Sequence, residues 1–185
     1  ANAFVKGMEV WMDGGDIDFD YSLVRPLGAR LLTMGGRASG PGPLKELMAF
    51  AKAKILRRQG RRLTNLDLHD IICEIGQIVV AGGVRRTALI SLSDLDDTDM
   101  RHAKDGQFYL TEGQRAMANN SAVYTEQPSA VQFMEEWLSL AKSGAGERGI
   151  FNRGSLTKQL PARRLKQWEQ SGYLENGIVV GVPGT

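Results

Sequence analysis

Helical segments alternate along this chain with short runs of β-forming residues, and this alternation constrains the fold more than any other feature. Apolar residues recur at helical spacing in three segments, 44–55, 68–79 and 130–141. Short runs that predict strands lie at 17–24, 86–92, 121–125, 150–151 and 178–182. Such alternation is typical of α/β domains rather than of helical bundles or β-sandwiches. The 185 residues are enough for one sizeable core, so no second domain is required.

Local signals place the ends of the first two helices. Pro43 stands at a first-turn position of a helix that should end near Gly60. Thr64 and Asp67, three residues apart, predict a capping box for the second helix. Apolar residues occur on more than one side of this second helix, so we expect it to be buried all round.

The second half of the chain carries similar signals. Ser129 and Gln132 predict a capping box for the helix over 130–141, and Gly144 should end it. The acidic segment 94–99 predicts a surface loop, and the polar segment 156–170 predicts a further helix.

A double glycine followed by two arginines marks the most informative loop. Glycine lets the backbone leave a helix and approach a ligand closely, and arginine forms forked hydrogen bonds with phosphates. We therefore predict a nucleotide-handling loop made of Ala81, Gly82, Gly83, Val84, Arg85 and Arg86. The alternative is a helix C-cap before a strand, although a cap alone needs no arginine.

A second glycine-rich segment, 35–44, lies upstream. Its backbone amides and the helix start that follows suit an anion such as a phosphate, with Ser39 and Gly40 as candidate backbone contacts on the substrate side. It matches neither the phosphate loop of NTPases nor the glycine pattern of dinucleotide folds. The alternative is a tight turn that docks a helix on a sheet.

Charge and cysteine content narrow the class of protein. With 23 basic and 21 acidic residues, the net charge of +2 identifies no class of partner. The single cysteine, Cys73, excludes an internal disulfide and is consistent with a reducing, cytoplasmic setting. Because Cys73 stands among isoleucines, we interpret it as a buried structural thiol rather than a nucleophile. No apolar run is long enough for a membrane helix.

Two further groups of residues have simple interpretations. His69 and His102 are too far apart, and lack the supporting carboxylates, to predict a metal site. A basic run could bind nucleic acid, but no aromatic residues interleave with it, so a solvated helix face is the favoured interpretation. This run comprises Lys45, Lys52, Lys54, Arg57, Arg58, Arg61 and Arg62.

Several motifs in a fixed order resemble the catalytic subunit of ribonucleotide reductases, most closely the adenosylcobalamin-dependent class. The resemblance rests on segments 19–28, 35–44, 81–88, 119–121 and 147–153. It implies one specificity loop near 25–36, where Arg25 meets the phosphates of the effector nucleotide. It implies a second near 81–87, where Arg85 bridges effector and substrate base.

The resemblance also implies a fold and an activity. Residues 1–185 would be a central fragment of one catalytic domain, the ten-stranded α/β barrel of these reductases, without a separate second domain. The parent enzyme would reduce ribonucleoside triphosphates or diphosphates by thiyl-radical chemistry, with adenosylcobalamin as the radical source. Its partners would be a ribonucleotide substrate, a deoxynucleotide effector and the remaining segments of the same reductase, with no membrane and no nucleic acid.

The chain departs from this family in its cysteines. The family uses a radical-bearing cysteine, a redox cysteine pair and an Asn-x-Cys-x-Glu motif, and none of these is present. A Gly-Thr pair like Gly184-Thr185 directly precedes that motif in the family. We therefore expect the fragment to carry no catalytic residues and to be inactive alone. Two alternatives stay open: a fragment of a class I-type reductase, and a stand-alone nucleotide- or RNA-binding module.

Overall fold

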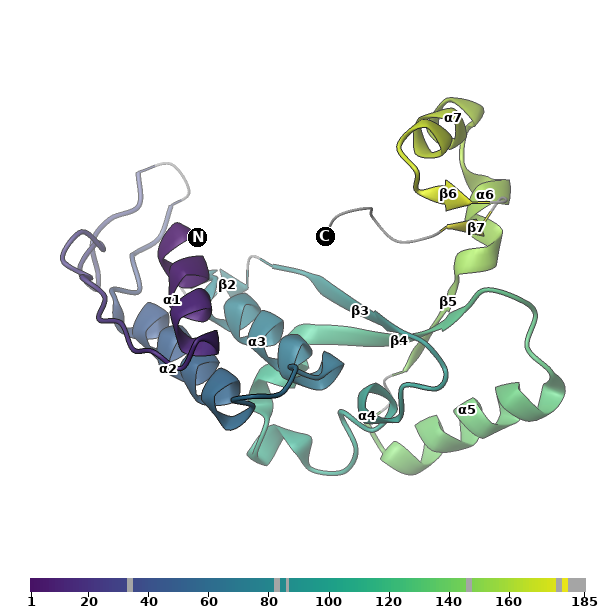
Figure 1. The fold of residues 1–185 in the computed structure, drawn as a ribbon, viewed down its shortest axis with the longest axis horizontal. Helices are drawn as coiled ribbons and strands as arrows, with labels where there is room; N and C mark the ends of the chain where they lie inside the picture. The colour runs from purple at the N-terminus through teal and green to yellow at the C-terminus, as the bar shows by residue number, and fades with distance from the viewer. Residues whose placement is uncertain (33–34, 82–83, 86, 146–147, 176–177, 180–185) are drawn as a thin grey trace. The chain divides into compact units, whose positions relative to one another are not determined.

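The computed structural model describes residues 1–32, 35–81, 84–85, 87–145, 148–175 and 178–179. The chain forms two compact units. The first comprises Ala1–Ile90 with Gln107–Ala118, and the second comprises Ser91–Gly106 with Asn119–Thr185. Helices occur together with parallel strands, so the α/β class is confirmed (Figure 1).

Three helices make up most of the first unit: α1 (Asn2–Met12), α2 (Gly42–Arg57) and α3 (Asn65–Ile78). α2 packs against both α1 and α3. The predicted starts of α2 and α3 are confirmed. Pro43 lies in the first turn of α2, and Thr64 forms the capping box with Asp67 at the start of α3. α1 was not predicted from the sequence.

The core of the first unit is an apolar cluster between these helices. Its buried members are Trp11, Met48, Ala51, Ile55 and Ile71. The strand predicted over 17–24 is wrong, because this segment forms turns and the amide of Ser22 donates to the Asp20 carboxylate at 2.8 Å. Phe19 still reaches the core, where it packs edge-on against Trp11 with ring centroids 5.9 Å apart.

α3 is not buried all round, contrary to the sequence prediction. Leu68 and Ile72 are 40% and 49% exposed, whereas His69, Asp70 and Cys73 are buried. A carboxylate that faces the interior satisfies its hydrogen-bonding capacity with cations from other elements, and this overrides the apolar periodicity.

The second unit is built on a three-stranded sheet with the order β3-β4-β5. The strands are β3 (Leu89–Ser93), β4 (Ala118–Tyr124) and β5 (Gly149–Asn152). β3 therefore begins later than the predicted run over 86–92. β4 and β5 are parallel, with Ser121 opposite Gly149 and Tyr124 opposite Asn152.

The crossover between β4 and β5 contains α5 (Ala130–Ser143), as expected for parallel neighbours. The predicted boundaries are confirmed: Ser129 and Gln132 form a capping box, and Gly144 ends the helix in a left-handed conformation with φ of 68°. The strand, helix and strand together form a βαβ unit.

Shorter elements complete the second unit, with two corrections. The acidic segment 94–99 is not entirely loop, because Asp97 caps the short helix α4 (Thr98–Arg101). The helix predicted over 156–170 is broken into α6 (Leu156–Gln159) and α7 (Ala162–Gln170). Pro161 causes the break because it disfavours helical backbone at the residue before it.

The end of the described chain is a small antiparallel pair. β6 (Leu174–Glu175) pairs with β7 (Ile178–Val179), and the rest of the strand predicted over 178–182 lies outside the described residues. Within the described ranges, none of the helices has the length and apolar character needed to cross a membrane.

Candidate functional site

The predicted nucleotide-handling loop follows directly after α3. The helix ends at Ile78, and Val79 is its C-cap. The interpretation of Gly82-Gly83 as the helix C-cap is therefore not supported, since the helix ends several residues earlier.

A short hairpin occupies the region of this loop. β1 (Val80–Ala81) pairs antiparallel with β2 (Val84–Arg85), with Ala81 opposite Val84. Gly82, Gly83 and Arg86 lie outside the described residues. The pairing brings the two sides of the loop together directly after α3.

The first predicted specificity loop is also held by backbone pairing. The amide of Gly28 donates to Ala38 at 2.9 Å, and the amide of Ala38 donates back to Ala29 at 2.8 Å. Arg37 donates to the carbonyl of Gly28 at 3.0 Å. Arg25 precedes this ladder and is exposed, and within the described part of the chain no hydrogen bond or ion pair engages its guanidinium. The side chain is therefore available to an anionic ligand.

Ser39 and Gly40 lie between this ladder and α2. Both are partly buried, and Gly40 has φ of 74°. A Cβ at Gly40 would lie 3.1 Å from the backbone nitrogen of Leu27, so the two backbone segments approach closely here. The glycine is thus required by the turn itself, which agrees with the tight-turn alternative for segment 35–44.

A buried ionic network lies on the inner side of α3. Asp70, only 1% exposed, accepts from Lys54 of α2 at 2.5 Å and from Arg115 at 2.6 and 2.9 Å. Arg115 belongs to the 3-10 helix η2 (Gly113–Met117), which packs on α3. Glu112 lies 3.4 Å from Lys54 and adds a second carboxylate.

The charge state of Asp70 follows from this geometry. Burial alone would raise the pKa of its carboxyl group, but hydrogen bonds from Arg115, His69 and Lys54 hold the pKa well below its ordinary value. Asp70 in turn raises the pKa of Arg115. Asp70 and Arg115 therefore form an ionised pair, and the network ties α2 and η2 to the helix that leads into the β1–β2 hairpin.

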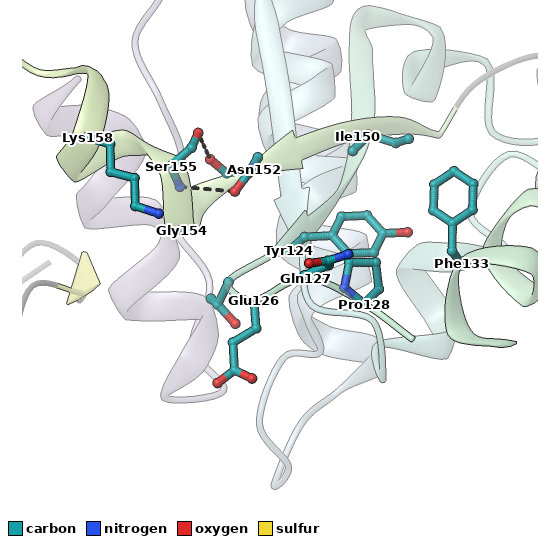
Figure 2. Close-up of a pocket in the computed structure, with 11 residues that line it drawn as sticks. Tyr124, Glu126, Gln127, Pro128, Phe133, Ile150, Asn152, Gly154, Ser155 and Lys158 are labelled. Atoms are coloured by element: carbon teal, nitrogen blue, oxygen red, sulfur yellow. Dashed lines mark hydrogen bonds between the residues drawn. The ribbon is translucent and has the colours of Figure 1, made fainter. Parts of the chain in front are cut away.

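The second unit contains a cavity of about 520 Å³ at the carboxyl ends of β4 and β5 (Figure 2). Tyr124, Asn152 and Lys158 contribute polar groups, and Phe133 and Ile150 contribute apolar surface. Gly154 is required beside it, because a Cβ there would clash with the carbonyl oxygen of Thr125. Ligands of α/β proteins commonly bind at this end of parallel strands.

A second ionic network lies beside a neighbouring pocket, which is lined by Glu136 and Arg148 and shares Tyr124 with this cavity. Arg148 donates to Glu136 of α5 at 2.7 Å and to Ser93 of β3 at 3.2 Å, and Arg101 also pairs with Glu136. Burial and the nearby Glu136 raise the pKa of Tyr124, so its hydroxyl stays protonated at neutral pH. The network joins β3, α4 and α5 to the start of β5.

The histidines and the cysteine do not form a metal centre in the described part of the chain, where no group of three ligand-type side chains comes together. The Sγ of Cys73 lies 3.7 Å from the His69 ring, and both residues are buried. His102 pairs with Asp105 at 2.7 Å on the surface. The thiol is thus enclosed, as the structural interpretation predicted.

Comparison with known proteins supports the sequence resemblance. No family model matches the chain. The chain is 39% identical over 133 residues to the adenosylcobalamin-dependent ribonucleoside-triphosphate reductase of Lacticaseibacillus paracasei, a match that covers 72% of the chain. It is 34% identical over 169 residues, 89% of its length, to the reductase of the same name from Lactobacillus gasseri. The chain is homologous to a segment of these reductases.

The match to the reductases is partial on their side. It covers 17% of the L. paracasei reductase and 20% of the L. gasseri reductase. The Euglena gracilis reductase of the same name is 31% identical over 60% of the chain. A crystal structure of a B12-dependent class II ribonucleotide reductase is 37% identical, with a TM-score of 0.48 over 54% of this chain and 13% of that chain.

The site residues that sequence analysis missed are the buried ionic groups. The sequence predicted no role for Asp70 or Arg115. It placed Lys54 on a solvated helix face, whereas the structure buries this residue, which is only 7% exposed. The one available signal was an aspartate inside the apolar periodicity of α3. Its partners could not be identified, because they come from positions 16 and 45 residues away.

Proposed function

We propose that this chain is a segment of an adenosylcobalamin-dependent ribonucleoside-triphosphate reductase, an enzyme that makes deoxyribonucleotides. The observation that carries the proposal is 39% identity over 72% of the chain to a reductase of that name. The names of the relatives favour triphosphate over diphosphate substrates, and the cobalamin class over a class I-type reductase.

Within that enzyme, the β1–β2 hairpin is the loop that selects the substrate base. The proposed loop is the segment Ala81, Gly82, Gly83, Val84, Arg85 and Arg86 of the sequence, and Arg85 bridges a deoxynucleotide effector and the ribonucleotide substrate. A guanidinium suits this role because it makes forked hydrogen bonds with phosphates and with base edges. The α3 network supports the proposal, since it gives the hairpin a rigid base.

The first loop supplies the effector side of the proposal. Arg25 binds effector phosphates, consistent with its exposed guanidinium and the paired backbone that follows it. Ser39 and Gly40 offer backbone groups on the substrate side. Coupling between the two nucleotides then depends on contacts that differ from one effector to another.

We also propose that residues 1–185 are a central fragment of one catalytic domain, a ten-stranded α/β barrel. The β4–α5–β5 unit supports this, because parallel strands joined by a helix are the repeating part of such barrels. The remaining strands would come from other segments of the same reductase.

The residues present do not fit the radical chemistry of adenosylcobalamin. Such chemistry needs a thiol that the cofactor can reach, and the only cysteine of the chain, Cys73, is 0% exposed beside His69. We assign the cofactor and the reacting thiols to the other segments. The isolated chain should therefore reduce no ribonucleotide, even with adenosylcobalamin and a dithiol present.

A segment exchange tests the proposed function. The matching segment of the L. paracasei reductase is replaced by this chain, and reduction of the four ribonucleoside triphosphates is measured with and without each deoxynucleotide effector. We expect turnover and an effector-dependent choice of base. A control exchange with the L. gasseri segment shows whether the junctions themselves are tolerated.

Two outcomes would contradict the proposal. If the control exchange is active and this one folds but is inactive, the segment is not functionally equivalent. If the isolated 185-residue chain reduces ribonucleotides, it must carry catalytic residues of its own, contrary to the proposal. A stand-alone nucleotide- or RNA-binding module is favoured by neither the relatives nor the charge balance.

A further inference from the structure

The basic run along α2 and the segment that follows it, residues 45–62, divides into cations with partners and cations without them. Lys45 lies over the Tyr21 ring, Lys52 pairs with Asp16, Lys54 with Asp70, and Arg57 and Arg58 with Asp67. Arg61 and Arg62 are exposed, and no carboxylate among the described residues pairs with them. Their charges are therefore not explained by the fold of this unit.

These two arginines stand at the rim of a pocket of about 400 Å³ in the first unit. The ends of three helices form its floor, with Met12 from α1, Ile55 from α2 and Leu68 from α3. The side-chain amide of Gln59 donates to the carbonyl of Met12 at 3.0 Å and closes one side. The floor is apolar, and Met12 and Leu68 are 49% and 40% exposed.

The charges around the pocket have a single sign. Arg58, Arg61 and Arg62 line it, and none of its described lining residues is acidic. The Asp67 carboxylate beside α3 already accepts from Arg58 at 2.7 Å. An apolar floor beneath unpaired guanidinium groups fits a ligand that combines an aliphatic group with carboxylates.

We propose that this pocket binds an acidic peptide segment of a partner protein, with an aliphatic side chain on the apolar floor and flanking carboxylates on Arg61 and Arg62. We choose an acidic partner because its carboxylates would complement the positive charges of Arg61 and Arg62. A nucleic acid fits less well, because no aromatic side chain that could stack on a base is among the described lining residues. None of the described lining residues belongs to the proposed specificity loops, and the peptide titration of the 185-residue chain does not rest on the proposed function, whereas the comparison with the segment-exchanged reductase does.

The test measures fluorescence anisotropy of a labelled peptide that alternates glutamate with leucine, titrated with the 185-residue chain. The variant Arg61→Glu/Arg62→Glu should weaken binding by about tenfold or more, as expected for two opposed ion pairs. The control is Arg163→Glu/Arg164→Glu, which reverses an exposed arginine pair on α7 and should change nothing. Binding should also fall as salt shortens the Debye length from about 30 Å to about 8 Å.

A second pair of variants tests the apolar floor. Leu68→Asn should weaken peptide binding, whereas Ile72→Asn should not, because Ile72 is a similarly exposed residue of α3 that is not among the pocket's described lining residues. Circular dichroism and thermal melting confirm that each variant is folded.

Three results would overturn the proposal. The first is that the peptide does not bind, or that its affinity falls equally in the Arg61→Glu/Arg62→Glu variant and in the Arg163→Glu/Arg164→Glu control. The second is a single-stranded RNA oligonucleotide that binds at Arg61 and Arg62 more tightly than the peptide. The third is a peptide that binds the 185-residue chain but not the segment-exchanged reductase, because the occupant would then be internal to the enzyme rather than a partner.

Discussion

The hydroxyl of Thr87 donates a hydrogen bond to the carbonyl oxygen of Gly76 across 3.2 Å. Gly76 lies in the last turn of α3, and Thr87 follows the β1–β2 hairpin by two residues. The carbonyls of a last helical turn lack partners within the helix. Thr87 satisfies one of them and ties the chain after the hairpin back to the helix that precedes it.

Replacing Thr87 should therefore lower stability through one lost hydrogen bond. Thr87→Val keeps the side-chain shape and leaves the buried Gly76 carbonyl without this donor, and we expect a loss of about 1 to 2 kcal/mol in the free energy of unfolding. Thr87→Ser retains the hydroxyl, so its free energy of unfolding should fall less than that of Thr87→Val. Urea unfolding of the three proteins measures the difference, and equal losses would show that the contact with Gly76 is not stabilising.

The ionised carboxylate of Asp70 should make the free energy of unfolding depend on pH in acid. Asp70→Asn removes the charge between Lys54 and Arg115 and leaves both cations with the more distant Glu112 as their remaining carboxylate, so we expect a loss of about 3 kcal/mol near neutral pH. Because the folded pKa lies below the ordinary value of about 3.9 for aspartate, the stabilisation is complete above that pH and is lost as the pH falls below it. The gap between wild type and variant should close in the same range.

Asp13→Asn is the matched control for this experiment. Asp13 is exposed, and no ion pair engages it within the described ranges. Its replacement should leave the free energy of unfolding nearly unchanged at every pH. A gap between wild type and Asp70→Asn that persists unchanged in acid would contradict the assigned ionic network.

A methyl group at Gly154 should disrupt the junction after β5. Its Cβ would clash with the Thr125 carbonyl oxygen, and backbone atoms cannot move aside as a flexible side chain can. Gly154→Ala should cost roughly 2 to 4 kcal/mol of stability. Gly113→Ala, where no atom lies within 4 Å of the added carbon, should be neutral. Thermal melts compare the two, and similar melting temperatures would exclude the close approach.

The two arginines of the proposed specificity loops should give different phenotypes in the segment-exchanged reductase. Arg85→Ala should blunt the effector-driven choice among bases by a coupling loss on the order of 1 to 3 kcal/mol. Arg25→Ala should instead raise the effector concentration needed for half-maximal response. Turnover of the four substrates over a range of effector concentrations separates these effects. Unchanged base selection with Arg85→Ala would remove this arginine from the proposed bridge.

Local chemistry made the helix ends predictable from sequence. The capping boxes at Thr64 and Ser129 and the stop at Gly144 depend only on neighbouring residues. Segment 17–24 failed for the opposite reason. Its alternating residues suited a strand, yet no neighbouring strand pairs with it among the described residues, and the turn at Asp20 allows Phe19 to reach the core from a loop.

The candidate site was predictable only in part. The glycines predicted a loop after α3, but the pairing of β1 with β2 within it was not predicted. The ionic network did not, because Lys54, Asp70 and Arg115 come together only when α2, α3 and η2 pack. The spacing of apolar residues along one helix shows which face is buried, but it does not show which residues of other helices will form ion pairs with that face.

The first unit is discontinuous in sequence, because residues 107–118 return to it after a segment that belongs to the second unit. This has a consequence for folding during synthesis. Asp70 and Arg115 are 45 residues apart. At the usual elongation rate of about 5 to 20 residues per second, roughly 2 to 9 s pass between their additions to the nascent chain. Before Arg115 has been synthesised, Asp70 can pair with Lys54 but not with Arg115. The contact between α3 and η2 can therefore form only after residues 113–117 have been added to the chain.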